Sequence, residues 1–380
     1  GINMANYTGM WGRGAQMQQV AAGSWPVPPN YLYVWGANST GQLGLGNRTN
    51  YSSPKQLGSG SGAWNLVTAG TYTSFAIKTD GSLWSWGANN QGQLGLGNRT
   101  YYSSPKQVGA LTNWSIVSSG DNWVLGIKTD GTLWSWGYNN LGQLGLNNIT
   151  AYSSPKQVGA LTNWSSVTSN TASAIVFATK TDGTLWSWGY NGQGALGLGN
   201  TVYAYSSPKQ VGSLTTWLQV TAGLYYGVAL KTDGTLWSWG VNASGSLGLG
   251  NRTSYSSPKQ IGALTSWYSV NSGAYHVIST KTDGTLWTWG DDSTGQLGLG
   301  NTTNYSSPKQ VGALTNWSKI TTGGNFCAVI KTDGTLWIWG QNSSGQLGLG
   351  NTTNYSSPKQ VGSLTTWKTI SSKWNNMLAT

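Results

Sequence analysis

The sequence contains no glutamate, and all nine of its acidic residues are aspartates. It also contains one cysteine, Cys327, and one histidine, His276. A single cysteine excludes an internal disulfide framework. These two residues alone supply neither a His/Cys metal cluster nor a surrounding set of partners for a nucleophile and its base. We therefore predict a protein without a metal site, a cofactor or an enzymatic activity.

Long apolar runs are also missing. No stretch approaches the 18 or so apolar residues of a membrane-spanning helix, so we expect no membrane insertion. The first residues lack a basic region followed by an apolar core, so we expect no secretory signal there. Charged residues make up 8% of the chain and aromatic residues 12%, and 56 residues are glycine. Such a composition excludes a charge-rich disordered chain and disfavours helices.

One sequence motif, Thr-Asp-Gly-Thr-Leu-Trp-Ser-Trp-Gly, recurs with small changes along the chain. Its Trp-Gly step falls at intervals of 50 to 52 residues, at Trp35, Trp86, Trp136, Trp188, Trp239, Trp289 and Trp339. A nearly fixed period of this size indicates a repeat architecture. The tryptophans recur once per unit, and we expect most of them to fill the space between neighbouring units.

Each unit contains four short segments with strand-like residues. In one unit these are residues 64–69, 74–78, 83–86 and 104–108. A Thr-Asp-Gly turn separates the second from the third, as expected for a hairpin. A glycine-rich bend separates the third from the fourth, and backbone geometry explains its glycines without a phosphate site. Four strands in about 50 residues, repeated seven times, are typical of β-propeller blades.

The sequence therefore predicts an all-β, seven-bladed β-propeller over residues 31–380. The last unit lacks its third strand, and the segment 31–35 supplies one, so we expect a composite closing blade built from the N-terminal and C-terminal segments. Residues 1–30 lie outside the repeat and form an N-terminal arm or linker. Trp11, Met17 and Trp25 are its candidate docking anchors, since apolar side chains on such an arm need covering. The alternative is a loosely ordered leader.

These motifs resemble a known family. The pattern Trp136-Gly-x-Asn-x-x-Gly142-Gln-Leu-Gly-Leu, with Ser-Pro-x-x-Val and the Thr-Asp-Gly hairpin, is similar to the RCC1-like repeat. The resemblance covers residues 31–380 and implies a seven-bladed propeller with split-blade closure. The low divergence between copies is similar to repeats of bacterial surface proteins and marine phage proteins. It is less similar to eukaryotic guanine-exchange members, which carry an acidic partner-contacting face and a wedge-like insertion.

The copies differ most at one position, the loop before the second strand. Candidate partner-binding or ligand-binding residues there are Tyr72, Thr73, Asn122, Trp123, Tyr225, Tyr226, Tyr275, His276, Asn325, Phe326, Trp374 and Asn375. We expect them to ring one face near the central channel, because variable side chains on a fixed frame build binding faces. The alternative is that the loop sequences vary because the fold tolerates substitutions there, without a role in binding. The aromatic side chains Trp123, Tyr226 and Trp374 are candidates for stacking on sugars.

A second set of candidates is a ring of lysines that follow Ser-Pro and have no acidic residue nearby. They are Lys55, Lys106, Lys156, Lys209, Lys259, Lys309 and Lys359. Seven like charges attract an anionic polymer or a surface glycan, whereas their even spread disfavours nucleic acid. The alternative is that proline and lysine protect an outer strand from edge-to-edge association. Asp291 and Asp292 lack the further acidic residues that would favour a calcium site.

Three hypotheses of function follow from the composition, the arm and the resemblance. Our first hypothesis is a structural or binding component of a larger particle or surface assembly, such as a phage virion, whose arm docks onto protein partners. A lectin-like adhesin that binds glycans or anionic polymers is the second. An exchange factor for a small GTPase is the third, and the lack of both glutamate and a wedge insertion argues against it.

Overall fold

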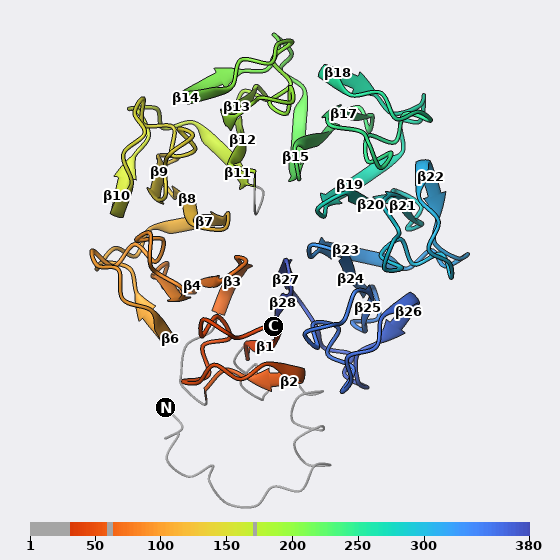
Figure 1. The fold of residues 1–380 in the computed structure, drawn as a ribbon, viewed down its shortest axis with the longest axis horizontal. Coiled ribbons are helices and arrows are strands. Elements are labelled where there is room, and N and C mark those ends of the chain that lie inside the picture. Colours follow the sequence, from red (N-terminus) through yellow and green to blue (C-terminus); the bar gives the residue numbers. More distant parts are fainter. Residues whose placement is uncertain (1–30, 59–63, 170–172) are drawn as a thin grey trace, which may run out of the picture.

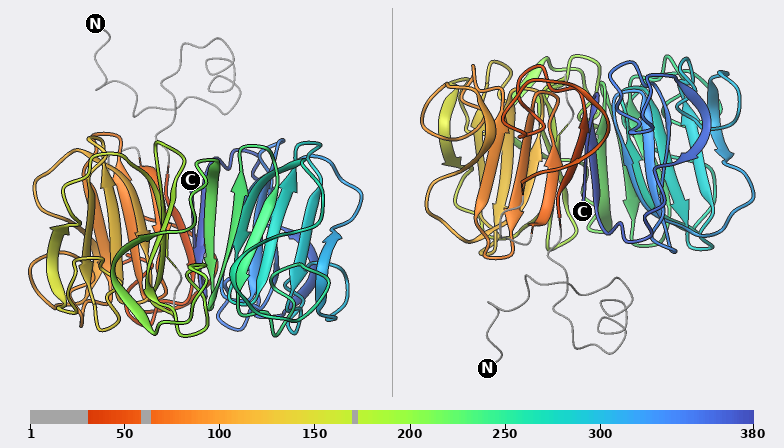
Figure 2. Two further views of the ribbon diagram at one scale, coloured as in Figure 1. Left: turned by 90° about the horizontal axis from the view of Figure 1, so that it is seen from above. Right: turned by 90° about the horizontal axis from the view of Figure 1, so that it is seen from below.

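The computed structural model describes residues 31–58, 64–169 and 173–380. Over these residues the chain forms seven four-stranded sheets and no helix. The sheets stand around a common axis as the blades of a propeller (Figure 1), and their strands run roughly along that axis (Figure 2). The predicted fold is thus confirmed. The predicted arm, with Trp11, Met17 and Trp25, lies outside the described residues.

One blade illustrates the plan that the others share. β3 (Trp64–Ala69) lies next to the axis, followed outward by β4 (Thr73–Lys78), β5 (Leu83–Gly87) and β6 (Tyr102–Gln107). All neighbours within the blade are antiparallel. The outer strand begins two residues before the predicted start, because Tyr102 pairs with Gly87 across an irregularity in the β5–β6 register.

The remaining strands follow the same order from the axis outward. They are β7 (Trp114–Ser119), β8 (Trp123–Lys128), β9 (Leu133–Gly137), β10 (Tyr152–Gln157), β11 (Trp164–Ser169), β12 (Ile175–Lys180), β13 (Leu185–Tyr190), β14 (Ala204–Gln210), β15 (Trp217–Gly223), β16 (Tyr226–Lys231), β17 (Leu236–Gly240), β18 (Tyr255–Gln260), β19 (Trp267–Ser272), β20 (His276–Lys281), β21 (Leu286–Gly290), β22 (Tyr305–Gln310), β23 (Trp317–Thr322), β24 (Phe326–Lys331), β25 (Leu336–Gly340) and β26 (Tyr355–Gln360).

The seventh sheet combines strands that are distant in sequence. Its order is β2 (Tyr51–Gln56), β1 (Tyr33–Gly36), β28 (Asn376–Ala379) and β27 (Ile370–Lys373). β1 pairs with β28 in antiparallel register, with Val34 opposite Leu378. The two inner strands therefore come from the last repeat and the two outer strands from the first, so β1 and β28 cover each other's edges.

The apolar core lies between blades. One cluster joins Phe75 and Leu94 of the β3–β6 blade to Trp114 and Trp136 of the β7–β10 blade. Trp136 is completely buried, and its Nε1–H donates to the carbonyl oxygen of Gln93 in the preceding blade at 2.9 Å. The tryptophans of all seven Trp-Gly steps make the same bond, at 2.9–3.0 Å. Each blade is thus fastened to its neighbour, and the predicted role of these tryptophans is confirmed.

The bend that accepts each tryptophan requires glycine. Gly95 has φ +73°, a conformation that L residues rarely adopt, and a Cβ there would lie 2.8 Å from Trp136 Nε1. The glycine-rich bends are therefore backbone features that let one blade approach the next, as the sequence indicated.

Candidate functional site

The loops between the first and second strands of the blades share a fixed backbone. In one blade the carbonyl oxygen of Tyr72 accepts a hydrogen bond from the Ala88 amide at 2.8 Å. The equivalent bonds run from Tyr138 to Asn122, Val241 to Tyr225, Asp291 to Tyr275, Gln341 to Asn325 and Ala37 to Asn375, at 2.7–3.0 Å. The side chains on this frame differ from blade to blade, which gives the face a distinct pattern in each sector.

The predicted loop residues divide into two sets. Tyr72 is exposed, and Asn122, Tyr225, Tyr275, Asn325, Trp374 and Asn375 are partly exposed. Thr73, Trp123, Tyr226, His276 and Phe326 are at most 3% exposed. The second set is a correction to the prediction: these residues begin the second strand, and their side chains belong to the interior between blades. Trp123 and Tyr226 therefore do not offer a surface for stacking on a sugar.

The register of two loops also differs from the sequence alignment of the copies. Ile175 lies opposite Gly189 and Asn376 lies opposite Gly36, just as Thr73 lies opposite Gly87. In the last unit, the residues equivalent to Tyr72 and Thr73 are therefore Asn375 and Asn376, one position later than the predicted Trp374 and Asn375. In the third unit, whose loop is two residues longer than that of the first, they are Ala174 and Ile175. The two extra residues of the third unit precede its second strand, which shifted the alignment.

A group of tyrosines gathers in one sector of this face. Tyr203 is 65% exposed and packs edge-on against Tyr190, with ring centroids 5.4 Å apart. Tyr190 in turn packs against Tyr225 of the next blade at 5.5 Å. We call these three residues the tyrosine cluster. Sequence reasoning missed Tyr190 and Tyr203, although the position after Trp-Gly varies between copies as much as the loop does.

Backbone strain marks several loops of this face. Tyr225 has φ +66°, Ala174 at the equivalent place of the preceding blade has φ +52°, and Trp374 has φ +44°. Non-glycine residues in this region cost on the order of 1 kcal/mol or more and collect at binding sites. The loops therefore hold side chains in a geometry that folding alone does not favour.

Two opposite charges near the axis influence each other's pKa. Lys373 Nζ, on β27, donates to the carbonyl oxygen of Ser169 on β11 at 2.7 Å, although the two residues are 204 positions apart. Burial raises the pKa of Asp121 to about 6, opposed by a hydrogen bond from the Thr71 hydroxyl and by the charge of Lys373. Burial likewise lowers the pKa of Lys373 to about 8, and Asp121 opposes that shift. Non-adjacent blades are thus linked across the axis.

The lysine ring lies on the outermost strands. Each of its seven members is exposed and stands 5.3–5.8 Å from the ring centroid of the tyrosine four residues earlier. The pairs are Tyr51 and Lys55, Tyr102 and Lys106, Tyr152 and Lys156, Tyr205 and Lys209, Tyr255 and Lys259, Tyr305 and Lys309, and Tyr355 and Lys359. The contact holds each ammonium group near its strand by cation–π attraction. The ring therefore encircles the perimeter.

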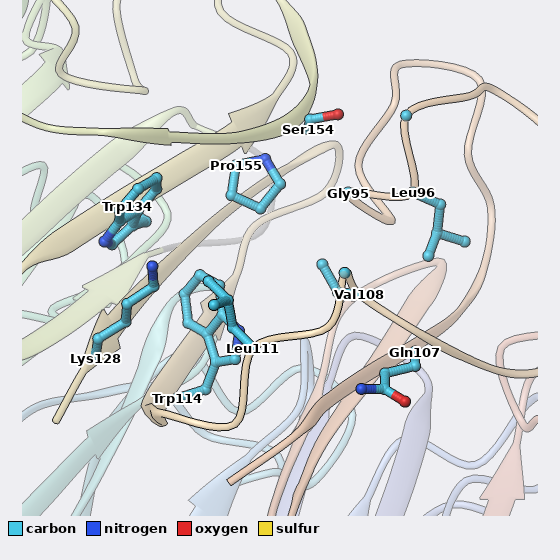
Figure 3. Close-up of a pocket in the computed structure, with 12 residues that line it drawn as sticks. Gly95, Leu96, Gln107, Val108, Leu111, Trp114, Lys128, Trp134, Ser154 and Pro155 are labelled. Atoms are coloured by element: carbon cyan, nitrogen blue, oxygen red, sulfur yellow. The ribbon is translucent and has the colours of Figure 1, made fainter.

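A second set of lysines, those that precede the Thr-Asp-Gly turns, lies beside cavities at the boundaries between blades. Lys128 Nζ lies 3.6 Å from the ring centroid of Trp134 and 5.2 Å from that of Trp114 (Figure 3). These residues line a cavity of about 360 Å³ whose rim includes Leu111, which is 51% exposed. Similar cavities of about 420 and 300 Å³ lie beside Trp317 and Trp217. Burial lowers the pKa of Lys128.

The reactive side chains that the sequence singled out lie in the interior. His276 is completely buried, and burial lowers its pKa to about 4. Cys327 is also buried, and burial raises the pKa of its thiol. Neither side chain is exposed to solvent. Over the described ranges, three or more His, Cys, Asp or Glu side chains do not gather at any one place, and no helix is long and apolar enough to cross a membrane.

Comparison with known proteins agrees with this architecture. Seven stretches match the regulator of chromosome condensation (RCC1) repeat, at residues 30–77, 80–127, 130–172, 182–230, 233–279, 283–330 and 333–374. The chain belongs to the RCC1 repeat family. Two solved structures share the fold of this RCC1-repeat chain: human WBSCR16, with a TM-score of 0.82 and 20% identity, and Prp20p of Saccharomyces cerevisiae, with 0.81 and 19%. The alignments cover 92% and 93% of this chain, and 98% and 92% of those chains.

Curated relatives are similar over shorter lengths. The ultraviolet-B receptor UVR8 of Arabidopsis thaliana is 32% identical over 221 residues, which is 57% of this chain and 50% of that protein. The probable E3 ubiquitin-protein ligase HERC3 of Homo sapiens is 38% identical over 96 residues, 24% of this chain and 9% of that protein. The chain thus spans half or less of these relatives. The narrower resemblance to bacterial surface and phage proteins stays a prediction.

Proposed function

We propose that this chain is a rigid protein-binding module that contacts its partner through the face carrying the variable loops. The tyrosine cluster is the observation that supports this most directly. Tyr203 is 65% exposed, and Tyr190 and Tyr225 join it across two blades by edge-on packing. Exposed tyrosines with restricted mobility are enriched at the centres of protein interfaces.

The family context supports the same class of function. Prp20p, which shares the fold, was studied for its binding to Gsp1p and histones, which are proteins. The buried blade-to-blade contacts of this chain make a stiff frame, and a stiff frame lowers the entropy that binding costs. The strained backbone at Tyr225 fits a residue held ready for a partner.

Affinity capture from the native source tests the proposal. The face variant changes two residues of the tyrosine cluster, Tyr203→Ser with Tyr225→Ser. The rim variant changes two residues of the lysine ring, Lys156→Ser with Lys209→Ser. We expect the face variant to lose a captured protein at least tenfold, because hot-spot residues, among which tyrosine is enriched, each contribute about 2 kcal/mol or more. The rim variant should retain it. Capture that survives in the face variant and disappears in the rim variant would contradict the proposal.

That opposite outcome would favour the second candidate, a binder of glycans or anionic polymers. Its supporting observations are the seven exposed lysines on the perimeter and the formal net charge of +11. Binding through such a ring weakens steeply with salt. Binding through the tyrosine cluster depends on salt far less.

The assembly hypothesis is a narrower form of the first. If residues 1–30 dock onto a larger particle, deletion of that segment abolishes incorporation and leaves the propeller folded. Unchanged incorporation would remove the docking idea while leaving the protein-binding face as it is.

A further inference from the structure

The bend between the third and fourth strands is closed by an asparagine in six of the seven blades. Asn89 shows the arrangement: its Oδ1 accepts from the Leu94 amide at 2.9 Å, and its Nδ2 donates to the carbonyl oxygen and to Oδ1 of Asn98, at 3.0 and 3.1 Å. The other five closing residues are Asn38, Asn139, Asn191, Asn242 and Asn342, each with the same two acceptors. In each of these bends, therefore, two oxygens converge on one N–H₂ group.

In two of these bends a third oxygen joins the pair. Asn139 Nδ2 also donates to the carbonyl oxygen of Thr150, and Asn242 Nδ2 to that of Thr253, both at 3.0 Å. The fold thus brings up to three oxygens around this point. Because all of these oxygens are hydrogen-bond acceptors, this part of the bend needs the donor that the asparagine N–H₂ group supplies.

The remaining blade has an aspartate at this place. Asp292 Oδ1 accepts from the Leu297 amide at 2.8 Å, as the asparagines do, so the side chain has the same orientation. Asn301 Oδ1 still accepts from the Thr303 amide at 2.9 Å, as Asn98 Oδ1 does from the Thr100 amide. The Asp292 amide also donates to Asn304 Oδ1 at 2.8 Å, as the Asn342 amide does to Asn354 Oδ1, so these hydrogen bonds of the bend match those of the other blades.

The aspartate replaces the donor by an acceptor. Asp292 is completely buried, and among the described residues no donor meets its Oδ2. By analogy with Asn89, this atom takes the place of Nδ2, and we infer that the oxygens of Asn301 face it. An ionised carboxylate buried against other acceptors is strongly unfavourable unless positive charge lies between them.

We propose that Asp292 Oδ2, the two oxygens of Asn301 and the carbonyl oxygen of Thr303 form a binding site for one hard divalent cation, with Ca²⁺ the best fit. Carboxylate, amide and backbone oxygens are the ligands that Ca²⁺ prefers, and it tolerates irregular arrangements better than Mg²⁺ does. Asn301 and Thr303 are exposed, so water can complete the coordination. The carboxylate of Asp291, the preceding residue, accepts from Gln296 and Ser293, at 2.6 and 2.8 Å, and adds a second negative charge to this bend.

The test compares the metal-free wild-type chain with Asp292→Asn, which recreates the group found in the other six blades and should therefore fold. Calcium binding is measured by calorimetric titration and by thermal unfolding at pH 7.5, with MgCl₂ and NaCl arms at matched ionic strength. We expect one Ca²⁺ per wild-type chain and a rise in Tm that grows with Ca²⁺ concentration. Asp292→Asn should show neither effect, and Asp291→Asn should bind Ca²⁺ several-fold more weakly.

Two other results would overturn the proposal. If wild-type and Asp292→Asn chains respond equally to millimolar Ca²⁺, the ion binds elsewhere. If Ca²⁺ has no effect on either chain, the site holds a proton on Oδ2, or the Asn301 amide has turned to donate, and there is no metal site.

Discussion

Replacement of one interblade tryptophan tests how the blades are held together. In Trp136→Phe the indole N–H that reaches Gln93 across the blade boundary at 2.9 Å is lost. The Gln93 carbonyl then has no donor in the interior, which costs about 1–3 kcal/mol. The smaller ring also leaves unfilled volume, and truncation of large core side chains costs up to about 5 kcal/mol when the site does not collapse. We expect a total loss of about 2–4 kcal/mol.

The matched control lies two residues away on the same strand. Trp134 is only partly buried, and its Nε1 donates to Thr132 Oγ1 at 2.8 Å within its own blade. Trp134→Phe should therefore cost about 1 kcal/mol or less. Urea unfolding followed by tryptophan fluorescence and by circular dichroism measures both. Equal losses, or a larger loss for Trp134→Phe, would refute the view that interblade contacts dominate stability.

Three further predictions concern the bends, the axis and the tyrosine cluster. Gly95→Ala should destabilise the chain by at least about 1 kcal/mol more than Gly109→Ala, because both glycines have positive φ but only Gly95 faces a neighbouring indole at 2.8 Å; urea midpoints measure the difference. The difference in Tm between the wild-type chain and Asp121→Asn should fall as pH rises from about 4 to about 6, because the pKa of Asp121 is raised on folding. This comparison separates Asp121 from Asp292, whose pKa is also raised, and from His276, whose pKa is lowered. The pKa of Lys373 is lowered, so its contribution to stability returns above about pH 8. Tyr225→Gly relieves φ +66° and should leave urea stability unchanged within about 1 kcal/mol while partner capture falls, whereas unchanged capture would contradict the role of the cluster.

The sequence predicts the strands well because local chemistry is repeated seven times. The Thr-Asp-Gly turn fixes each hairpin, for example through Asp130 Oδ1, which accepts from the amide and hydroxyl of Thr132 at 2.9 and 2.7 Å. The site is predicted less well. The loop before the second strand ends one residue earlier than its variability suggests, so Trp123 and Tyr226 belong to the interior.

Other features of the site depend on closure of the ring. Lys373 meets Ser169 only because the blades surround one axis, and no spacing in the sequence predicts that contact. Asp292 stands out in the sequence as a departure from the repeated asparagine. The consequence of this departure is visible only in the structure, where the equivalent asparagine donates to two oxygens and Asp292 Oδ2 has no donor among the described residues.

The pairing of β1 with β28 is the central claim, and a disulfide tests it most directly. In a Cys327→Ser background, Val34→Cys with Leu378→Cys places two cysteines directly opposite each other, whereas Val34→Cys with Ser371→Cys places them two strands apart. Cα atoms of opposite residues lie about 4.5–5.5 Å apart, within disulfide range, and those two strands apart lie about 9–10 Å apart, beyond it. We predict that mild oxidation cross-links the first pair and leaves the second reduced. Failure of the first pair to cross-link in the folded protein, or equal cross-linking of both pairs, would contradict the closed ring.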